Sequence, residues 1–377
     1  MGKSWLFNGC LILFVLVFST CNNAKNKSFE DRPVPSPYPI KYAKGFQIQY
    51  FNDYKKLIIN APYPNAKEAK EYIISNKAIS NLEHEISSPI KSIVVTSTTH
   101  IPMLELLNVE DKLKGFPNTD YVSSEKTRKL IDEEFVLDLG HEEQMNTELL
   151  LELDPDLVIG FSMTSNNKMF ETIRKTGIPV ILNGDWLEET PLGRAEWIRF
   201  FGVLFDLDKK ADSIFLEIEK NYIEAKKIAK KAKKQPTIIS GGLFKEIWNM
   251  PAGESFEATF LKDANADYIW KKTKGNGSLS LNIENVYEQG SDADLWISPS
   301  YYSSMEDLGK ANYLYSKFKA FKNNKVYTFV NKKGSTGGIK YFELAPARPD
   351  LVLKDIIKIA HPNLYSDYNF TFFELLK

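Results

Sequence analysis

The chain has 377 residues, of which 43% are hydrophobic and 26% are charged, with 48 Lys and Arg against 49 Asp and Glu. This composition excludes a disordered chain, a coiled coil and a collagen. A formal net charge of −1 argues against a dedicated nucleic-acid-binding protein, which usually carries a basic excess. Because Cys10 and Cys21 are the two cysteines, the body that follows offers no disulfide, thiolate metal site or cysteine nucleophile.

The start of the chain has the pattern of a secretory signal. Lys3 precedes an apolar run over residues 10–18, and small residues follow it. A membrane-spanning helix needs about 20 apolar residues, more than this run provides. The residues leading to Cys21 resemble a relaxed lipobox, which implies a signal peptide over residues 1–20 and a lipid on Cys21. We therefore expect the protein on the periplasmic face of a bacterial membrane.

A polar segment separates this signal from the body. Residues 21–44 are predicted to be the lipidated cysteine and a flexible linker, because the segment is polar and carries Pro33, Pro35, Pro37 and Pro39. Such a linker would hold the body away from the membrane surface.

The body begins with an α/β pattern over residues 45–205. A hairpin around residues 52–53 is followed by predicted strands at 91–97, 157–160 and 179–182, with helical segments between them. Strands that alternate with helices at this spacing predict a parallel sheet.

A long helix is predicted over residues 206–234, because apolar residues recur at spacings of three and four from about residue 208. Its lysine-rich face is interpreted as a solvated surface, since acidic residues share the helix. A second α/β lobe follows over 235–345, and 346–377 form a closing helix and tail. The predicted fold is two α/β lobes, with parallel-type sheets flanked by helices, bridged by a single long α-helix. A cleft between two lobes is a preferred place for a small-molecule site.

The sequence contains no complete enzyme motif. His141-Glu-Glu lacks the second histidine of a zinc-protease helix. Residues 275–280 lack the third glycine of a dinucleotide loop, and residues 334–340 lack the Gly-Lys-Ser/Thr step of a phosphate loop. We therefore predict neither an enzyme nor a bound cofactor.

Five segments in order resemble the Fe/cobalamin-type periplasmic substrate-binding proteins of ABC importers, in their lipoprotein form. They are residues 93–115, residues 145–159 with the Met-Asn-Thr-Glu signature, residues 281–286, residues 292–297 and the closing residues 349–362. The resemblance implies two lobes joined by a helix, which agrees with the pattern read from the residues. It also implies that the protein hands its ligand to the permease dimer of an ABC transporter. We expect a monomer, and no nucleic-acid partner.

Two glutamates match the positions that meet permease arginines in this family, Glu148 in the first lobe and Glu284 in the second. Fixed carboxylates can accept bidentate hydrogen bonds from guanidinium groups and set the docking register. The alternative is that each stabilises a helix start through the helix dipole. Because both positions match, docking is the favoured interpretation.

Ligand contacts are expected from loops that face the cleft. The candidates are Ser97, Thr98, His100, His141, Phe161 and Trp186 in the first lobe, and Trp248, Tyr301, Tyr302 and Arg348 in the second. Arg194, Lys340 and Tyr341 are further candidates, and Arg194 is open to the alternative of a surface ion pair. Arginine suits an anionic iron(III)-siderophore chelate, whereas aromatic residues suit cobalamin as well. A zinc or manganese site with His100 and His141 as ligands is a third alternative, and an unrelated extracytoplasmic enzyme or surface lipoprotein is a fourth.

Overall fold

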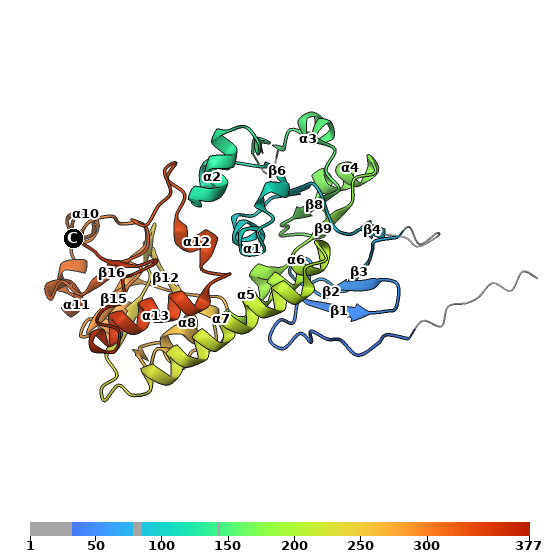
Figure 1. The fold of residues 1–377 in the computed structure, drawn as a ribbon. Coiled ribbons are helices and arrows are strands. Elements are labelled where there is room, and N and C mark those ends of the chain that lie inside the picture. Colours follow the sequence, from blue (N-terminus) through green and yellow to red (C-terminus); the bar gives the residue numbers. More distant parts are fainter. Residues whose placement is uncertain (1–31, 78–84, 142–143) are drawn as a thin grey trace, which may run out of the picture. The chain divides into compact units, whose positions relative to one another are not determined.

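The computed structural model describes residues 32–77, 85–141 and 144–377. The chain divides into residues 1–32 and 33–377, and residues 33–377 contain the helices and strands of the fold (Figure 1). The predicted signal peptide, Cys21 and the first part of the predicted linker lie outside the described residues.

The first lobe contains a parallel sheet, as the sequence predicts. Its strand order is β7-β6-β5-β8-β9. Successive strands are added on one side of β5 and then on the other, so the strand order switches between β5 and β8. The strands are β5 (Ile93–Val95), β6 (Leu113–Phe116), β7 (Leu137–Asp138), β8 (Leu157–Gly160) and β9 (Val180–Leu182). The helices between them are α1 (Ile101–Leu106), α2 (Glu125–Asp132), α3 (Thr147–Leu153) and α4 (Lys168–Lys175).

A second sheet precedes this one. The expected hairpin is present as β1 (Phe46–Tyr50) and β2 (Lys55–Ile59), which pair antiparallel. The sheet continues through β3 (Lys70–Ser75) and β4 (Glu85–Ser87), two strands that the sequence analysis did not predict. Inward residues such as Phe46, Leu57 and Ile74 join the core of the first lobe.

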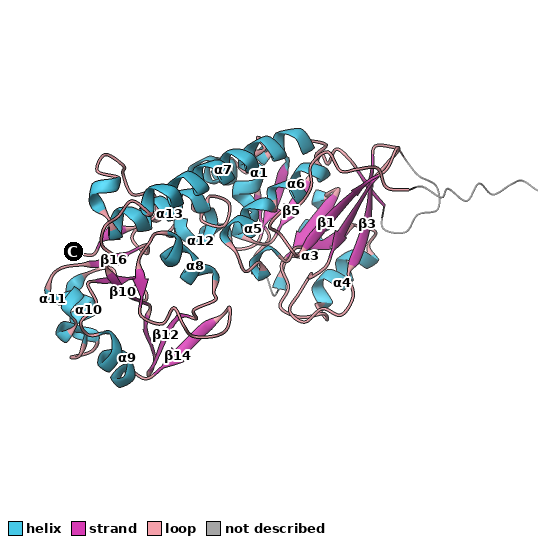
Figure 2. Cartoon of the chain, turned by 90° about the horizontal axis from the view of Figure 1, so that it is seen from below, coloured by secondary structure: helices cyan, strands magenta, loops and turns pink. Residues whose placement is uncertain are grey.

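One long helix joins the two lobes. After α5 (Pro191–Glu196) and α6 (Ile198–Leu204), α7 runs over Asp208–Ala229 and lies beside α13 (Pro349–Ala360) (Figure 2). Phe215 and Ile218 of α7 belong to the core of the first lobe, whereas Tyr222 and Ala225 belong to the core of the second. This confirms the bridging helix. Its predicted end at residue 234 is wrong, because the helix stops at Ala229 and the chain turns into the second lobe.

The second lobe is a five-stranded sheet in the order β13-β10-β15-β16-β17, with β17 antiparallel at the edge. Its strands are β10 (Thr237–Ser240), β13 (Asp267–Tyr268), β15 (Leu295–Ile297), β16 (Val326–Thr328) and β17 (Glu374–Leu375). A small antiparallel sheet contains β11 (Gly242–Phe244), β12 (Ile247–Pro251) and β14 (Ser278–Leu281). The helices are α8 (Phe256–Asp263), α9 (Ile283–Gly290), α10 (Met305–Ala311), α11 (Lys319–Lys322), α12 (Lys340–Leu344) and α13.

The last part of the predicted flexible linker is bound to the first lobe. The buried carboxylate of Glu196 accepts hydrogen bonds from the backbone N–H groups of Tyr42 and Ala43, at 2.6 and 2.8 Å. Glu188 accepts the backbone N–H of Lys44 at 2.9 Å. These charge-assisted bonds fix residues that the sequence analysis assigned to a flexible linker, so that assignment is corrected for this part of it.

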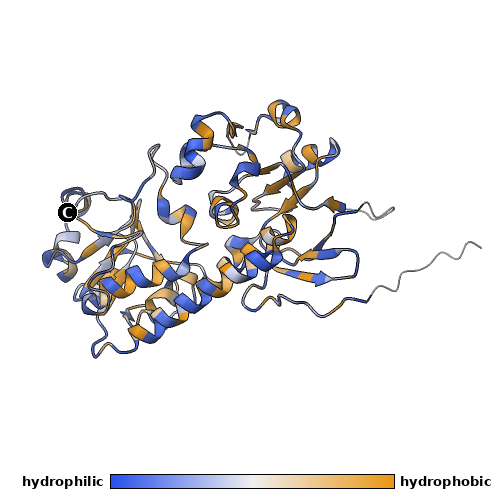
Figure 3. Cartoon of the chain, in the orientation of Figure 1, coloured by the Kyte–Doolittle hydropathy of each residue, from blue (hydrophilic) through white to orange (hydrophobic). Residues whose placement is uncertain are grey.

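The buried strands of both parallel sheets are strongly apolar (Figure 3). Among the described residues, no helix combines the length and the hydrophobicity that crossing a membrane requires.

Candidate functional site

The ends of the parallel strands from both lobes meet at two neighbouring cavities. In open α/β sheets, ligands bind beyond the carboxyl ends of the strands, at the topological switch point where the strand order reverses. Thr96 follows β5 and Phe161 follows β8 in the first lobe, and both line a cavity of about 330 Å³. Gly241 follows β10, Ser298 follows β15 and Phe329 follows β16 in the second lobe, and these line a cavity of about 490 Å³.

We call the larger of these two the Arg194 cavity, because Arg194 is its cation. Arg194 lies on α5, whose first turn is capped by the Thr190 hydroxyl, which accepts from the Gly193 N–H at 3.1 Å. Its guanidinium donates to the carbonyl oxygens of Trp186 and Glu188, at 3.0 and 3.2 Å. Its central carbon lies 3.9 Å from the centre of the Phe256 ring. These contacts hold the cation in one place.

Among the described residues Arg194 takes part in no ion pair, although the charges of nearby Asp185, Glu257 and Glu188 act on it. Burial lowers the pKa of its guanidinium, and the charge of Asp185 opposes that shift. An arginine has five N–H donors, and carbonyl oxygens occupy two of those of Arg194. A held cation with unused donors is suited to bind an anionic group.

Glu257 lies in the first turn of α8 and lines the same cavity. Its side chain is exposed to the open space of the cavity. Desolvation by the cavity walls raises the pKa of Glu257, and the charge of Arg194 opposes the shift. The cavity therefore combines a cation with a carboxyl group that resists ionisation.

Aromatic rings of the second lobe line the Arg194 cavity. Phe329 and Tyr341 stack with their ring centres 4.5 Å apart and an interplanar angle of 16°. Phe342 meets Phe329 edge to face at 5.3 Å. The structure thus places Tyr341, a predicted candidate, in the wall of the cavity.

We call the smaller cavity the Phe161 cavity. It brings together the predicted candidates Ser97, Thr98 and Phe161. His141 lies beside this cavity, because its Nδ1 is 2.7 Å from the Oδ1 of Asn118, a residue that lines the cavity. Its side chain is exposed. Trp186 packs against Phe161, with ring centres 5.3 Å apart.

Two predicted ligand residues are core residues instead. Trp248 is fully buried, donates from Nε1 to the Ser240 carbonyl oxygen at 2.9 Å, and stacks on Trp296 with ring centres 5.2 Å apart. His100 is fully buried against Phe201, and burial lowers the pKa of its ring. Neither side chain reaches a cavity, so both predictions of ligand contact are corrected.

Three further candidates lie away from both cavities. Arg348 forms a bidentate ion pair with the buried carboxylate of Asp350, at 2.9 and 2.8 Å, at the start of α13. Tyr301 is 69% exposed, and Tyr302 packs on Tyr315 with ring centres 6.2 Å apart. The structure therefore does not bring these three residues to the candidate site, because none of them lines either cavity.

Several cavity residues were missed by the sequence analysis. Ser240, Ser298 and Phe329 stand at the ends of the apolar strands β10, β15 and β16, so their position was a usable signal. Glu257 and Phe342 belong to helices whose orientation depends on how the lobes pack, and no local pattern indicates it.

Glu148 and Glu284 occupy equivalent positions in the two lobes. Each is exposed and is the second residue of a helix, α3 or α9. Each follows an asparagine cap: the side-chain oxygen of Asn146 accepts the Leu149 N–H at 3.0 Å, and that of Asn282 accepts the Asn285 N–H at 2.8 Å. The two lobes therefore present the same motif to solvent.

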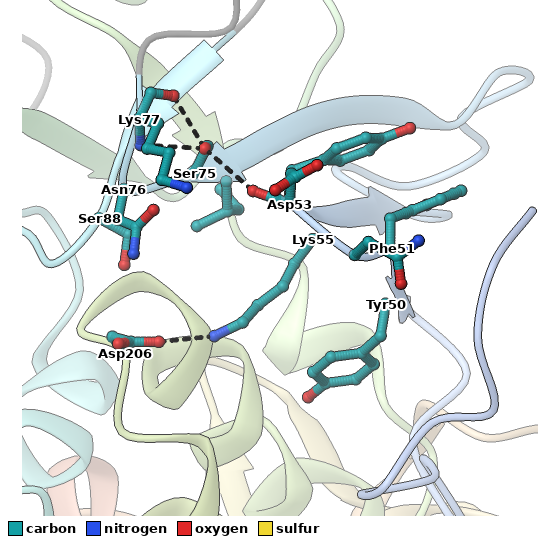
Figure 4. Close-up of a pocket in the computed structure, with 12 residues that line it drawn as sticks. Tyr50, Phe51, Asp53, Lys55, Ser75, Asn76, Lys77, Ser88 and Asp206 are labelled. Atoms are coloured by element: carbon teal, nitrogen blue, oxygen red, sulfur yellow. Dashed lines mark hydrogen bonds and ion pairs between the residues drawn. The ribbon is translucent and has the colours of Figure 1, made fainter. Parts of the chain in front are cut away.

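Other cavities lie outside these two, among them the following pair. The Lys340 cavity, of about 880 Å³, lies against the opposite side of α12 and is lined by Lys340, Glu343 and Ser123. A pocket of about 260 Å³ lies on the N-terminal sheet, where Lys55 donates to Asp206 at 2.8 Å (Figure 4). Among the described residues, no group of three or more His, Cys, Asp or Glu side chains is placed to hold a metal ion.

Comparison with known proteins identifies similar chains. A family model described as periplasmic binding protein matches residues 93–332. A lipoprotein of Methanocaldococcus jannaschii is 24% identical over 362 residues, covering 89% of this chain and 84% of that protein.

Solved structures share the fold, and two of them serve as examples. One is described as a possible iron-binding, periplasmic solute-binding protein of Staphylococcus epidermidis, with a TM-score of 0.57, 17% identity, and coverage of 72% of this chain and 99% of that one. The other is a periplasmic binding protein of Veillonella parvula, with a TM-score of 0.59, 16% identity, and coverage of 84% and 95%.

Proposed function

The chain belongs to the periplasmic binding protein family, and on that premise we propose that it captures an anionic iron(III)-siderophore-type chelate and delivers it to an ABC transporter permease. The observation that carries the proposal is the Arg194 cavity, where a guanidinium that takes part in no ion pair among the described residues faces the ends of the second lobe's strands. The S. epidermidis structure of the same fold is described as a possible iron-binding protein.

The cavity chemistry suits such a cargo. Ferric siderophores often carry negative charge, which the unused donors of Arg194 can bind. Polar groups such as Ser240 and Ser298 can accept or donate hydrogen bonds to the chelate. The stacked pair of Phe329 and Tyr341 favours cobalamin as a second candidate, because a corrin edge is close to neutral and packs on aromatic walls.

Changing Arg194 to Gln distinguishes these two cargoes. Loss of a charged hydrogen-bond donor should weaken binding of an anionic ferric siderophore by about 10- to 100-fold, and should leave cobalamin binding nearly unchanged. Arg174→Gln removes an exposed arginine outside both cavities and serves as the control. Equal affinity of the wild-type protein and Arg194→Gln for every anionic chelate would remove the proposed role of this residue.

We propose that Glu148 and Glu284 dock on the permease. Support comes from their shared exposed position after an asparagine cap, one in each lobe. The double variant Glu148→Ala, Glu284→Ala should bind ligand normally and should fail to stimulate the ATPase of the reconstituted transporter. The control, Glu152→Ala with Glu288→Ala, removes an exposed glutamate from each of the same two helices. Full stimulation by the first double variant would contradict docking at these residues.

We also propose that Cys21 carries the lipid anchor, with support from the similar lipoprotein of M. jannaschii. The expected mass of the mature protein corresponds to cleavage before Cys21 and addition of lipid. Cys21→Ser should abolish that addition and release the protein from membranes. An unchanged membrane-bound fraction would show that another segment anchors the chain.

A further inference from the structure

Phe342 separates the two cavities at the strand ends. It lines both the Arg194 cavity and the Phe161 cavity, and 44% of its surface is exposed to them and to solvent. Its ring rests edge to face on Phe329 at 5.3 Å, and its backbone N–H donates to the Ile339 carbonyl oxygen at 3.2 Å. The side chain therefore forms a wall between the two cavities.

The helix that carries this wall is attached to the first lobe, although it belongs to the second lobe by sequence. Helix α12 packs on the turn over Thr98–His100 and lies beside α1 (Figure 1). Glu343, which is only 2% exposed, accepts the Ser123 backbone N–H at 2.7 Å. This bond joins the residue next to Phe342 to the first lobe.

The loop before α12 is attached in the same way. Thr336 Oγ1 donates to the Asp120 carbonyl oxygen at 2.9 Å. Gly338 approaches the backbone so closely that a Cβ would lie 2.2 Å from the Tyr121 carbonyl oxygen. These contacts fix α12 and the loop before it against the first lobe, and the Phe342 ring rests on Phe329 of the second lobe.

We propose that Phe342 is a specificity-determining residue that limits the size of the ligand by keeping the Phe161 cavity separate from the Arg194 cavity. The inference rests on the proposed function, since it concerns which ligands the same cleft admits. Ligands confined to the Arg194 cavity are favoured, and ligands that need both spaces are disfavoured. Replacing the ring by a methyl group joins the two spaces.

The first test titrates the full-length protein with ferric chelates that share one iron-binding group and increase in size. Phe342→Ala should raise affinity for the largest chelate relative to the smallest by at least about tenfold, a change that pocket volume commonly produces. Phe342→Tyr keeps the ring and should keep the wild-type ratio. Phe244→Ala truncates an exposed phenylalanine of β11 and is the control. An unchanged ratio in Phe342→Ala overturns the proposal.

The second test does not depend on the natural cargo. The fluorophore 1-anilinonaphthalene-8-sulfonate carries an anionic sulfonate and linked aromatic rings, so it can pair with Arg194 and fill a joined cavity. Phe342→Ala should bind it at least about tenfold more tightly than wild type, and adding Arg194→Gln should reverse the gain. Failure of every chelate to bind wild type would reject the proposed cargo, while the fluorophore would still decide the role of Phe342. If Phe342→Ala binds the fluorophore no more tightly than wild type, and thermal unfolding shows that the variant is folded, the proposal for Phe342 is overturned.

Discussion

Glu343 makes the stability of the protein depend on pH. Burial raises its pKa to about 7, the Ser123 N–H opposes the shift, and the charge of Glu105 adds to it. In the folded state Glu343 keeps its proton to a higher pH than its usual pKa of 4.5 would allow. The stability that this protonated carboxyl group contributes is therefore complete below pH 4.5 and is lost as the pH rises through 7. Between pH 5 and pH 8 the loss amounts to about 2.5 kcal/mol, at 1.36 kcal/mol per pKa unit.

Glu343→Gln removes the titration but keeps an oxygen that can accept the Ser123 N–H. We expect the free energy of unfolding of wild type to fall between pH 5 and pH 8 by about 2.5 kcal/mol more than that of the variant. Urea denaturation followed by circular dichroism at both pH values measures this difference. Glu125→Gln, an exposed carboxylate that lines the same Lys340 cavity, is the matched control. If the free energies of unfolding of wild type and Glu343→Gln change with pH in parallel, Glu343 does not cause the pH dependence.

Two further substitutions test the packing. Trp248→Ala should lower the free energy of unfolding by about 3–5 kcal/mol in urea denaturation, because Trp248 fills the core of the second lobe; a loss below about 1 kcal/mol would show that it does not. Gly338→Ala should cost about 1–3 kcal/mol in the same assay, since its Cβ would lie 2.2 Å from the Tyr121 carbonyl oxygen. Its control is Gly277→Ala, where a Cβ meets nothing within 4 Å, and equal effects of the two would contradict a close contact between the lobes at Gly338.

The alternation of strands and helices made the two lobes predictable from the sequence. It also indicated that Ser97, Thr98 and Phe161 lie at strand ends, where they line the Phe161 cavity, and their contact with a ligand stays a prediction. The end of α7 was not predictable from the apolar stripe, which continues past Ala229 although the chain turns there. Where a helix leaves its partners depends on the tertiary structure, which a helical period does not encode.

Trp248 shows how a local signal misled the sequence analysis. Neighbouring Asn, Pro and Gly residues indicated a loop, yet Trp248 and Met250 alternate with more exposed residues as the inward face of β12. Period-two alternation was the better signal.

Phe342 and Glu257 were beyond prediction for a different reason. Their role arises where helices of the second lobe face the first, and sequence patterns within one element say nothing about that contact.

A fluorescence titration of the full-length wild-type protein with anionic ferric siderophores and with cobalamin tests directly which cargo it binds. Trp186 lies against Phe161, with ring centres 5.3 Å apart, so a coloured ligand in the cleft should quench its emission. We expect saturable quenching by an anionic ferric chelate and weaker or no binding of cobalamin. No binding of any ferric chelate by the folded protein, or binding of cobalamin alone, would contradict the assignment of the Arg194 cavity to an anionic iron(III) cargo.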